Sequence, residues 1–308
     1  MEKVLAILGP TAVGKTKLSI ELAKRFNGEI ISGDSMQVYR GLDIGTAKIT
    51  PSEMAGVTHH LIDIKDVTAR YSVAEFVTRA QQLITEITAR GHLPMVVGGT
   101  GFYAKALLYE MNLGGDHYDE RETVRNKWRD FLAANGQHAL WLTLASVDSV
   151  AADRIPETNT RRVIRALEVY ETTGVRFSAQ QSELTPRYDA MVIGLNTARD
   201  QLYDRINQRV DEMMTAGLID EAKWLLAAQG FDHQAGKGIG YREFEAYFSG
   251  EQSLDDVAAT IKLDTRHYAK RQLTWLRHQL PVTWYDLVQY PAELTKIMVA
   301  VQDWLAID

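Results

Sequence analysis

The eight residues from Gly9 to Thr16, GPTAVGKT, constrain the fold of this 308-residue chain more than any other stretch. They follow an apolar run at residues 4–8, and the residues after them are apolar at helical spacing: Leu18, Leu22, Ala23 and Phe26. A glycine-rich loop that joins a strand to a helix and ends in Lys and Thr is typical of phosphate-binding sites. The sequence therefore predicts a cradle for linked phosphates, without identifying the molecule that carries them.

Each residue type in this loop has a physical reason to be there. Gly9 and Gly14 allow backbone conformations that turn successive N–H groups toward an anion, and the N-terminus of the following helix adds a partial positive charge. Lys15 supplies a full charge, and the hydroxyl of Thr16 is a ligand for Mg²⁺. We expect the whole loop to contact the phosphates: Gly9, Pro10, Thr11, Ala12, Val13, Gly14, Lys15 and Thr16.

The composition is that of an ordinary globular enzyme, with 45% hydrophobic and 24% charged residues. No apolar stretch approaches the ~20 residues that a membrane span requires, and the first residues enter a strand without the pattern of a signal peptide. The absence of cysteine excludes disulfides, thiolate metal ligands and cysteine nucleophiles. We expect a cytoplasmic protein, and the net charge of -6 argues against indiscriminate coating of nucleic acid.

Two further loops are expected beside the phosphate loop, because each follows a buried strand. The strand pattern at residues 29–32 leads into Asp34, and the pattern at 94–97 leads into a second glycine-rich turn that contains Thr100. Ligands of open α/β sheets bind outside the carboxyl ends of the strands, so these loops should share one site. Asp34 is then a candidate general base, although capping a turn is the ordinary role of an Asp after a strand.

The order of strand and helix patterns indicates a sheet interrupted by an inserted helical subdomain. Residues 59–64 read as a short strand, and residues 73–90 as an amphipathic helix that covers the sheet. From about residue 114 the chain becomes polar and helical, with four expected buried anchors: Trp128, Phe131, Trp141 and Leu142. We expect an α/β fold, with a P-loop NTPase-like parallel sheet flanked by helices in residues 1–114 and 190–308, and a helical subdomain in residues 115–189.

Basic residues recur at i,i+4 spacing on single helix faces: Arg161 with Arg165, Arg205 with Arg209, and Lys262 with Arg266 and Lys270. For the helix with Arg161 and Arg165, a solvated surface is the default explanation. The set from Lys262 to Lys270, which has Tyr268 and Trp275 interleaved among its basic residues, instead favours contact with a phosphate backbone and base stacking, with a solvated helix face as the alternative. The residues alone leave two functions open. One is transfer between a phosphorylated small molecule and a nucleic acid, and the other is phosphorylation of a small molecule.

Several segments, in order along nearly the whole chain, resemble those of the tRNA dimethylallyltransferases. Besides the phosphate loop they are DSMQVYRGLDIGTAK at 34–48, HHLIDI at 59–64, PMVVGGTGFY at 94–103, RVIRALE at 162–168, GIGYRE at 238–243 and AKRQLTWLR at 269–277. The resemblance implies Mg²⁺-dependent transfer of a dimethylallyl group from dimethylallyl pyrophosphate to N6 of the adenosine 3′ of the anticodon in tRNA. The phosphate loop would hold the pyrophosphate of the donor rather than ATP. Lys15 and Mg²⁺ at Thr16 would stabilise the departing pyrophosphate, with Arg205 and Arg209 as further clamps.

The resemblance also implies roles at the acceptor. Asp34 would accept the proton of the adenine amine, and Thr100 would assist at the target base. The residues expected to contact the tRNA anticodon stem-loop are Asp34, Ser35, Met36, Gln37, Thr100, Arg125, Arg161, Arg162, Val163, Ile164, Arg165, Lys237, Gly238, Ile239, Gly240, Tyr241 and Arg242. We expect a monomer.

The sequence departs from the family pattern in two places, and three other functions compete with the implied one. Val13 replaces the common Ser or Ala, and residues 156–160 lack the usual aspartate, for which Asn159 would substitute. A nucleoside or small-molecule kinase would use Asp34 as the base for an attacking hydroxyl. Its metal-holding carboxylate would have to be Asp63, because the strand at 94–97 is followed by Gly-Gly-Thr instead of an Asp. A prenyltransferase acting on free adenine nucleotides would not need the helix with Arg161 and Arg165. A non-catalytic RNA-binding module would not need the candidate base Asp34.

Overall fold

The computed structural model describes residues 1–111, 118–180 and 185–307, which form two compact units. Unit 1 comprises Met1–Tyr109 and Pro186–Asp308, and unit 2 comprises Glu110–Thr185. The insertion predicted from the sequence is residues 115–189. Tyr109 and Pro186 pair in an antiparallel bridge, which holds together the two points at which the chain leaves and re-enters unit 1.

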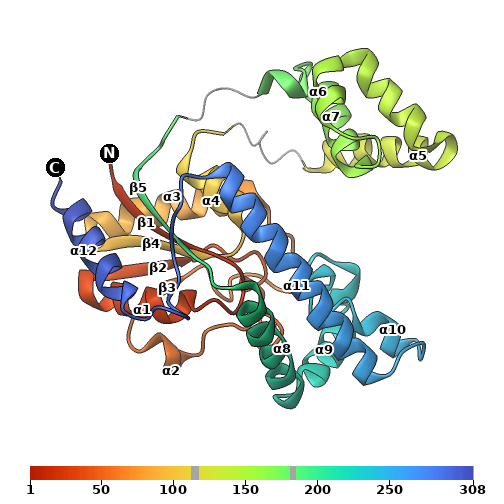
Figure 1. Ribbon diagram of the computed structural model, residues 1–308. Coiled ribbons are helices and arrows are strands. Elements are labelled where there is room, and N and C mark those ends of the chain that lie inside the picture. The colour runs from red at the N-terminus through yellow and green to blue at the C-terminus, as the bar shows by residue number, and fades with distance from the viewer. Residues whose placement is uncertain (112–117, 181–184, 308) are drawn as a thin grey trace. The chain divides into compact units, whose positions relative to one another are not determined.

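Unit 1 is built on a six-stranded sheet with the order β3-β2-β4-β1-β5-β6 (Figure 1). The strands are β1 (Lys3–Leu8), β2 (Gly28–Ser32), β3 (His59–His60), β4 (Leu93–Gly98), β5 (Asp189–Leu195) and β6 (Thr283–Tyr285). Near the centre, Leu5 of β1 pairs with Met95 of β4 and with Met191 of β5. All neighbouring strands are parallel, so their carboxyl ends lie at one edge of the sheet, and the α/β prediction is confirmed.

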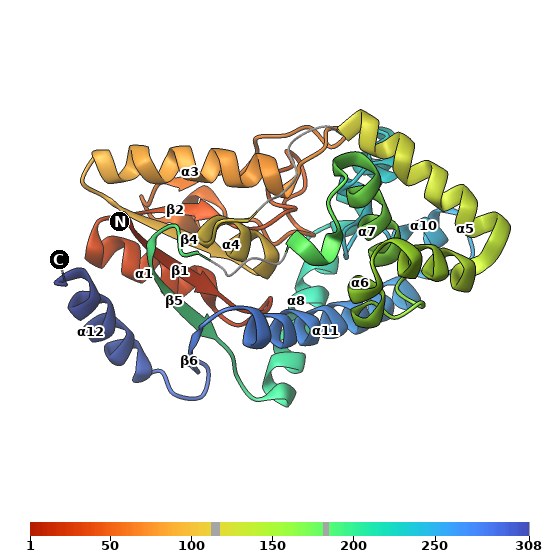
Figure 2. The same ribbon diagram turned by 90° about the horizontal axis from the view of Figure 1, so that it is seen from above.

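Four helices cover the two faces of the sheet: α1 (Lys15–Phe26) and α12 (Glu293–Leu305) on one face, and α3 (Val73–Ala89) and α4 (Gly101–Leu108) on the other (Figures 1 and 2). Side chains alternate along a strand, so Leu5 and Ile7 of β1 pack in the same core cluster as α1 and α12. Val4 and Ala6 are buried too, toward the opposite face. The amphipathic helix predicted at residues 73–90 is α3.

The remaining helices of unit 1 extend beyond the sheet (Figure 1). They are α2 (Pro51–Met54), α8 (Arg199–Thr215), α9 (Leu218–Ala227), α10 (Phe244–Phe248) and α11 (Leu254–Gln279), with 3-10 helices at Gly230–Asp232 and Ala235–Lys237. α11 begins at a capping box, in which the Ser253 hydroxyl accepts a hydrogen bond from the Asp256 backbone. None of the helices in the described ranges is long and apolar enough to cross a membrane.

The strand predicted at residues 59–64 is shorter in the structure. Only His59 and His60 pair with β2. Leu61 and Asp63 adopt positive φ angles of 63° and 54°, which a strand does not allow. The chain therefore turns away from the sheet directly after β3.

Unit 2 consists of α5 (Tyr118–Val147), α6 (Ser149–Arg154), α7 (Thr160–Thr173) and a 3-10 helix at Phe177–Gln180. Trp128, Phe131 and Trp141 pack against its core, which includes Leu140 and Leu144. The prediction that Leu142 is buried is wrong, because 51% of this residue is exposed. Two residues along a helix correspond to a rotation of about 200°, so Leu142 points away from the face that carries Leu140 and Leu144.

Candidate functional site

A cavity of about 540 Å³ lies at the carboxyl edge of the sheet in unit 1. The loops after β1, β2 and β4 form part of its wall, and α8, α11 and the stretch from residue 234 to 242 form the rest. The structure thus brings together the three loops that the sequence placed at one edge. Among their residues, Lys15, Asp34 and Gly99 line the same space.

The phosphate loop has the backbone conformation that its glycines permit. Gly9 and Gly14 have φ angles of 152° and 102°, and a Cβ on Gly9 would lie 2.6 Å from the carbonyl oxygen of Leu195. α1 starts at Lys15 directly after Gly14, and no side chain caps it, so N–H groups of its first turn remain for a ligand. Thr16 is exposed in this turn and lines the cavity.

Lys15 lies among charged groups from two other elements. Its Nζ donates a hydrogen bond of 2.6 Å to the carbonyl oxygen of Pro10. Burial lowers the pKa of Lys15 to about 8; the charge of Asp34 acts in the opposite direction, and that of Arg209 lowers the pKa further. Lys15 is therefore close to both the candidate base and one of the two predicted arginine clamps.

Arg205 and Arg209 of α8 both face the phosphate loop. The Nε of Arg205 donates a 2.8 Å hydrogen bond to the carbonyl oxygen of Ala12. Arg209 lines the main cavity and also a second hollow of about 470 Å³ that Lys15 lines as well, where Arg205 joins it. Burial, together with the charge of Arg205, lowers the pKa of Arg209. A phosphate in this region would meet two guanidinium groups as well as the loop.

Asp34 combines the two roles considered for it from the sequence. Its Oδ1 accepts hydrogen bonds from the backbone N–H groups of Met36 and Gln37, at 2.8 and 3.4 Å. In the described part of the chain, hydrogen bonds reach only this oxygen, and Asp34 lines the cavity. Its turn-capping bonds therefore fix the orientation of a carboxylate whose Oδ2 is left for a ligand.

Thr100 follows β4 and precedes α4 without capping that helix through its side chain. It is not among the described residues that line the cavity, but it lies close to Tyr268 of α11, which does line the cavity. Burial raises the pKa of Tyr268 to about 12; the charge of Asp34 adds to this effect, and hydrogen bonds with Thr100 and Gln272 oppose it. Thr100 thus lies next to Tyr268, one of the two aromatic residues that the sequence analysis places among the basic residues of this helix.

The stretch from Lys237 to Arg242 lines the cavity, as do Ser35, Met36 and Gln37. Tyr241 is fully buried, and its hydroxyl donates a 2.6 Å hydrogen bond to Glu221 of α9. Its side chain is therefore a structural support of this wall, and the predicted tRNA contact at this position would have to use the backbone. Arg242 is exposed and pairs with Glu243 and Asp264.

Glu221 is a site-supporting residue that the sequence analysis missed. Its carboxylate accepts hydrogen bonds from the backbone N–H groups of Asp43, Ile44 and Gly45, at 2.8, 2.8 and 2.9 Å, as well as from Tyr241. It joins two cavity-lining loops that are far apart in the sequence. No local pattern marks it, because all four donors come from other elements.

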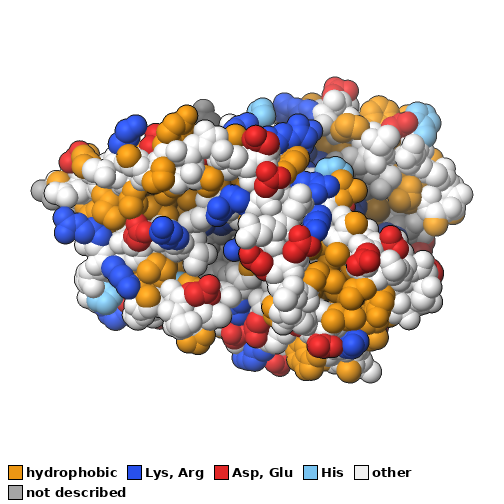
Figure 3. All heavy atoms as spheres, turned by 60° about the horizontal axis from the view of Figure 1, so that its bottom comes forward, with side chains coloured by type: hydrophobic (Ala, Val, Ile, Leu, Met, Phe, Trp, Pro, Cys, Tyr) orange, Lys and Arg blue, Asp and Glu red, His pale blue; other side chains and the backbone are white. Residues whose placement is uncertain are grey.

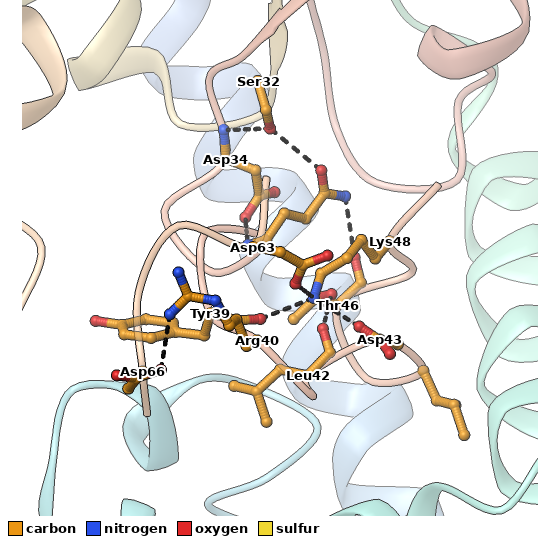
Figure 4. Close-up of polar contacts among 12 residues, drawn as sticks. Ser32, Asp34, Tyr39, Arg40, Leu42, Asp43, Thr46, Lys48, Asp63 and Asp66 are labelled. Carbon is orange, nitrogen blue, oxygen red and sulfur yellow. Dashed lines mark hydrogen bonds and ion pairs between the residues drawn. The ribbon is translucent and has the colours of Figure 1, made fainter. Parts of the chain in front are cut away.

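Lys48 organises the loop between β2 and α2 (Figure 4). Its Nζ is buried, lies 2.6 Å from both Asp43 Oδ1 and Asp63 Oδ1, and donates to the carbonyl oxygen of Tyr39. Asp63, the only substitute considered for the metal-holding carboxylate of a kinase, is thus engaged in an ion pair. It also follows β3, three places from β1 in the sheet, which corresponds to about 14 Å.

In unit 2 the predicted tRNA contacts fall into three groups. The side chains of Val163 and Ile164 belong to the core of the unit, so the predicted tRNA contact at these two positions would have to use the backbone. Arg125 and Arg165 both pair with Glu168, which is fully buried. Arg161 and Arg162 are exposed, and Asn159 caps the start of their helix, because its side chain accepts a hydrogen bond from the Arg162 backbone. Asn159, which would substitute for the aspartate of the family pattern, thus caps this helix.

The basic stripe of α11 is only partly available. Lys262 pairs with Asp211 and Arg266 donates to Asn207, both of α8, whereas Lys270 is exposed. On the face shown in Figure 3, Lys and Arg side chains alternate with Asp and Glu rather than forming one continuous basic coat. This mixture agrees with the net charge of -6.

Comparisons with known proteins match the whole chain. Residues 37–279 match a family model described as IPP transferase. The tRNA dimethylallyltransferase of Latilactobacillus sakei is 55% identical over 306 residues, which cover 99% of this chain and 98% of that protein. The tRNA dimethylallyltransferase of Enterococcus faecalis is 52% identical over 305 residues, covering 99% and 98%.

Solved structures agree with this assignment. The tRNA isopentenylpyrophosphate transferase of Bacillus halodurans has a TM-score of 0.75 and 48% identity, covering 99% of this chain and 97% of that chain. A eukaryotic dimethylallyltransferase acting on tRNA has a TM-score of 0.82 and 30% identity, covering 98% and 79%. These matches confirm the resemblance that the sequence segments showed. The chain belongs to the IPP transferase family, together with the tRNA dimethylallyltransferases.

Proposed function

We propose that this protein transfers the dimethylallyl group of dimethylallyl pyrophosphate to N6 of the adenosine 3′ of the anticodon in tRNA. One observation carries the proposal: a single cavity is lined by the phosphate-loop Lys15 and by Asp34, whose Oδ2 is left for a ligand. A positively charged group that can bind a leaving pyrophosphate and a base that can accept a proton from an amine thus line the same cavity. The curated relatives are named tRNA dimethylallyltransferases, which supports dimethylallyl transfer to tRNA.

The donor would bind through the phosphate loop and the two arginines. When the C–O bond of the donor breaks, pyrophosphate takes the bonding electrons and an allylic cation remains. Backbone N–H groups, Lys15 and Arg209 neutralise the negative charge that develops on the phosphate oxygens. Because the pKa of Lys15 is lowered to about 8, an arriving pyrophosphate favours its protonated form, which strengthens this interaction.

The residues at the loop fit a magnesium ion that is held together with the substrate. Mg²⁺ prefers oxygen ligands and is usually bound by one or two protein groups plus phosphates. Thr16 presents an exposed hydroxyl in the first turn of α1, and the described residues contain no cluster of three carboxylate or histidine ligands that would hold a metal alone. We assign the ion to Thr16 and the donor pyrophosphate, where it would supply further neutralisation of the leaving group.

Asp34 would act on the acceptor. The lone pair of an adenine amine is delocalised into the ring, so this nitrogen is a poor nucleophile until a base draws on its proton. As the N6–C bond forms and the C–O bond breaks, one N6 proton passes to Oδ2 of Asp34. The two backbone hydrogen bonds at Oδ1 hold the carboxylate in position for this transfer.

The tRNA would be held by groups on both units. Arg161 and Arg162 are exposed cations of α7, and Lys237 and Arg242 are exposed beside the cavity. The target base must leave the anticodon-loop stack to enter a cavity, which costs a few kcal/mol that contacts in the pocket offset. We further propose that the protein acts in the cytoplasm as a monomer, since one chain supplies every residue named for the reaction.

The kinase alternative fits the structure less well. A phosphate-loop kinase needs a carboxylate that holds Mg²⁺ near the transferred phosphate. β4, which neighbours the phosphate-loop strand, ends in Gly98 and Gly99 instead, and Asp63 is paired with Lys48 at the edge of the sheet.

A single assay on purified protein tests the proposal. Labelled dimethylallyl pyrophosphate and Mg²⁺ are incubated with unmodified tRNA, with the same tRNA lacking the target adenosine, and with AMP, while ATP consumption is followed separately. We expect label only in the intact tRNA and no ATP turnover. Label in AMP would indicate a free-nucleotide prenyltransferase, and ATP turnover without label transfer would indicate a kinase.

A further inference from the structure

Gln272 of α11 carries an unexplained polar atom at the wall of the cavity. The residue is 8% exposed, and its Nε2 donates a 2.8 Å hydrogen bond to the carbonyl oxygen of Gly99. Its Oε1 is buried and has no hydrogen-bond partner among the described residues. Buried polar atoms are almost always paired, so an unpaired acceptor at a cavity wall indicates a donor that arrives with the ligand.

The orientation of this amide is fixed by its surroundings. A carbonyl oxygen only accepts hydrogen bonds, so the atom that faces Gly99 must be the amide nitrogen. The approach is so close that a Cβ on Gly99 would lie 2.2 Å from Nε2. The amide cannot turn over without placing Oε1 against another acceptor. Oε1 is therefore an acceptor that no described residue pairs with, while Nε2 keeps a second N–H besides the one donated to Gly99.

Gln272 lies in the same cluster as the candidate base. Asp34, Tyr268 and Gln272 all line the cavity. Asp34 raises the pKa of Tyr268 through its charge, and the amide of Gln272 lies close enough to lower it. The cavity wall thus carries two acceptor groups of different kinds, a carboxylate and an amide oxygen, beside one buried tyrosine.

We propose that Oε1 of Gln272 accepts a hydrogen bond from the exocyclic amine of the acceptor base, and thereby selects a 6-amino purine over a 6-oxo purine. This inference rests on the proposed function. An amine at position 6 has two N–H groups, one for Asp34 and one for Gln272, and this arrangement uses both acceptors. A carbonyl at the same position, as in hypoxanthine, would face the unpaired Oε1 with a second acceptor and would be repelled. Sites built around such a hydrogen bond discriminate strongly against analogues that lack the donor.

The test compares three anticodon stem-loops that differ only at the target base, which is adenine, unsubstituted purine or hypoxanthine. Their affinities are measured by fluorescence anisotropy in the presence of inorganic pyrophosphate and Mg²⁺. For the unmodified protein we expect adenine to bind about five- to tenfold more tightly than purine, and hypoxanthine to bind more weakly than purine. Equal binding of adenine and hypoxanthine would overturn the inference without any variant.

The variant Gln272→Met keeps the length of the side chain and removes the amide. We expect the adenine-to-hypoxanthine ratio to fall by about tenfold, with the remaining preference due to Asp34. Gln279→Met makes the same change at the exposed end of the same helix, where the amide contacts Lys105, and should leave the ratio unchanged. If Gln272 only supports the Gly99 turn, all three stem-loops will lose affinity by the same factor, and that result would refute selection by Oε1.

The outcome is separable from that of the proposed function. Label transfer by the unmodified protein to the adenine stem-loop tests the function, whereas the affinity ratio tests Gln272. Transfer together with an unaltered ratio in Gln272→Met would leave the function standing and the inference rejected. If the protein prefers adenine over hypoxanthine but transfers no label, the proposed function is rejected, whereas the inference of an RNA site that selects an amine stands.

Discussion

Replacement of Glu221 by Ala should strongly destabilise unit 1, although this carboxylate is only partly buried. Three backbone N–H groups of residues 43–45 and the hydroxyl of Tyr241 all donate to this one carboxylate, at 2.6 to 2.9 Å. α9, which carries Glu221, thus fastens a loop that follows β2 to the loop that ends at Tyr241. Both loops line the cavity.

The size of the effect follows from what each donor loses. Hydrogen bonds to a charged group contribute about 1.5–3 kcal/mol each, but water replaces part of this at the partly exposed loop. The hydroxyl of Tyr241 is fully buried and would be left without a partner, at a cost of about 1–3 kcal/mol. We therefore expect Glu221→Ala to lower the free energy of unfolding by about 3–5 kcal/mol, within the range for breaking a paired buried group.

Urea unfolding followed by tryptophan fluorescence would measure this loss, and the label-transfer assay would report kcat/KM for tRNA. Asp220→Ala is the matched control, since Asp220 precedes Glu221 on α9 and forms an exposed pair with Lys223, worth at most about 1 kcal/mol. A double-mutant cycle with Tyr241→Phe should give a coupling energy of about 1–3 kcal/mol. If Glu221→Ala destabilises no more than Asp220→Ala, or if the coupling is zero, the bridging role of Glu221 is refuted.

Four further outcomes follow from the charges. The affinity for inorganic pyrophosphate should fall as pH rises above about 8, where Lys15 loses its proton, and calorimetry from pH 7 to 10 should show no such fall in Lys15→Arg; equal curves would contradict the assignment. Burial alone would raise the pKa of Glu29, but the hydrogen bonds and charges of its basic partners lower the pKa from 4.5 to about 2. Glu29 therefore contributes about 3 kcal/mol to the free energy of unfolding above pH 4.5, and this contribution is lost as the pH falls toward 2. Urea unfolding from pH 3 to 7 should therefore show a smaller pH dependence in Glu29→Gln, and an unchanged one would count against this. Asp34→Ala should lower turnover by about 10²–10⁴ while tRNA affinity stays within a few-fold, and unchanged turnover would remove Asp34 from the mechanism. Arg161→Ala combined with Arg162→Ala should weaken tRNA binding and reduce its salt slope by about 2, whereas an unaltered slope would return both residues to a solvated surface.

The elements nearest the chemistry can be predicted from the sequence because their signals are local. Glycines at 9 and 14, a Lys and a Thr define the phosphate loop within eight residues, and the apolar runs of β1, β2 and β4 define where three loops end. The rule that parallel strands share a carboxyl edge then places Asp34 beside Lys15. The structure brings both residues to one cavity, and the influence of Asp34 on the pKa of Lys15 expresses their proximity.

The residues that were missed depend on contacts between distant parts of the chain. Glu221 meets donors 176 to 178 residues away, and Gln272 meets a carbonyl oxygen 173 residues away. No local sequence pattern marks either residue, and the segment around Gln272 is recognisable by its lysines and arginines. Leu142 was assigned to the core because it is apolar, although its neighbours Leu140 and Leu144 already define the buried face of that helix.

The geometry between β2 and β4 explains why this phosphate loop suits group transfer to a base. A Cβ on Gly98 would lie 2.6 Å from the carbonyl carbon of Gly33, so the two loops approach as closely as backbones allow. A side chain at position 98 would therefore clash with the backbone of Gly33, so this position cannot carry the metal-holding carboxylate that a phosphate-loop kinase requires. The space is open instead to Asp34, one strand further along, and to Gln272 from α11. In the proposed reaction, the acceptor base would lie between the carboxylate of Asp34 and the amide of Gln272.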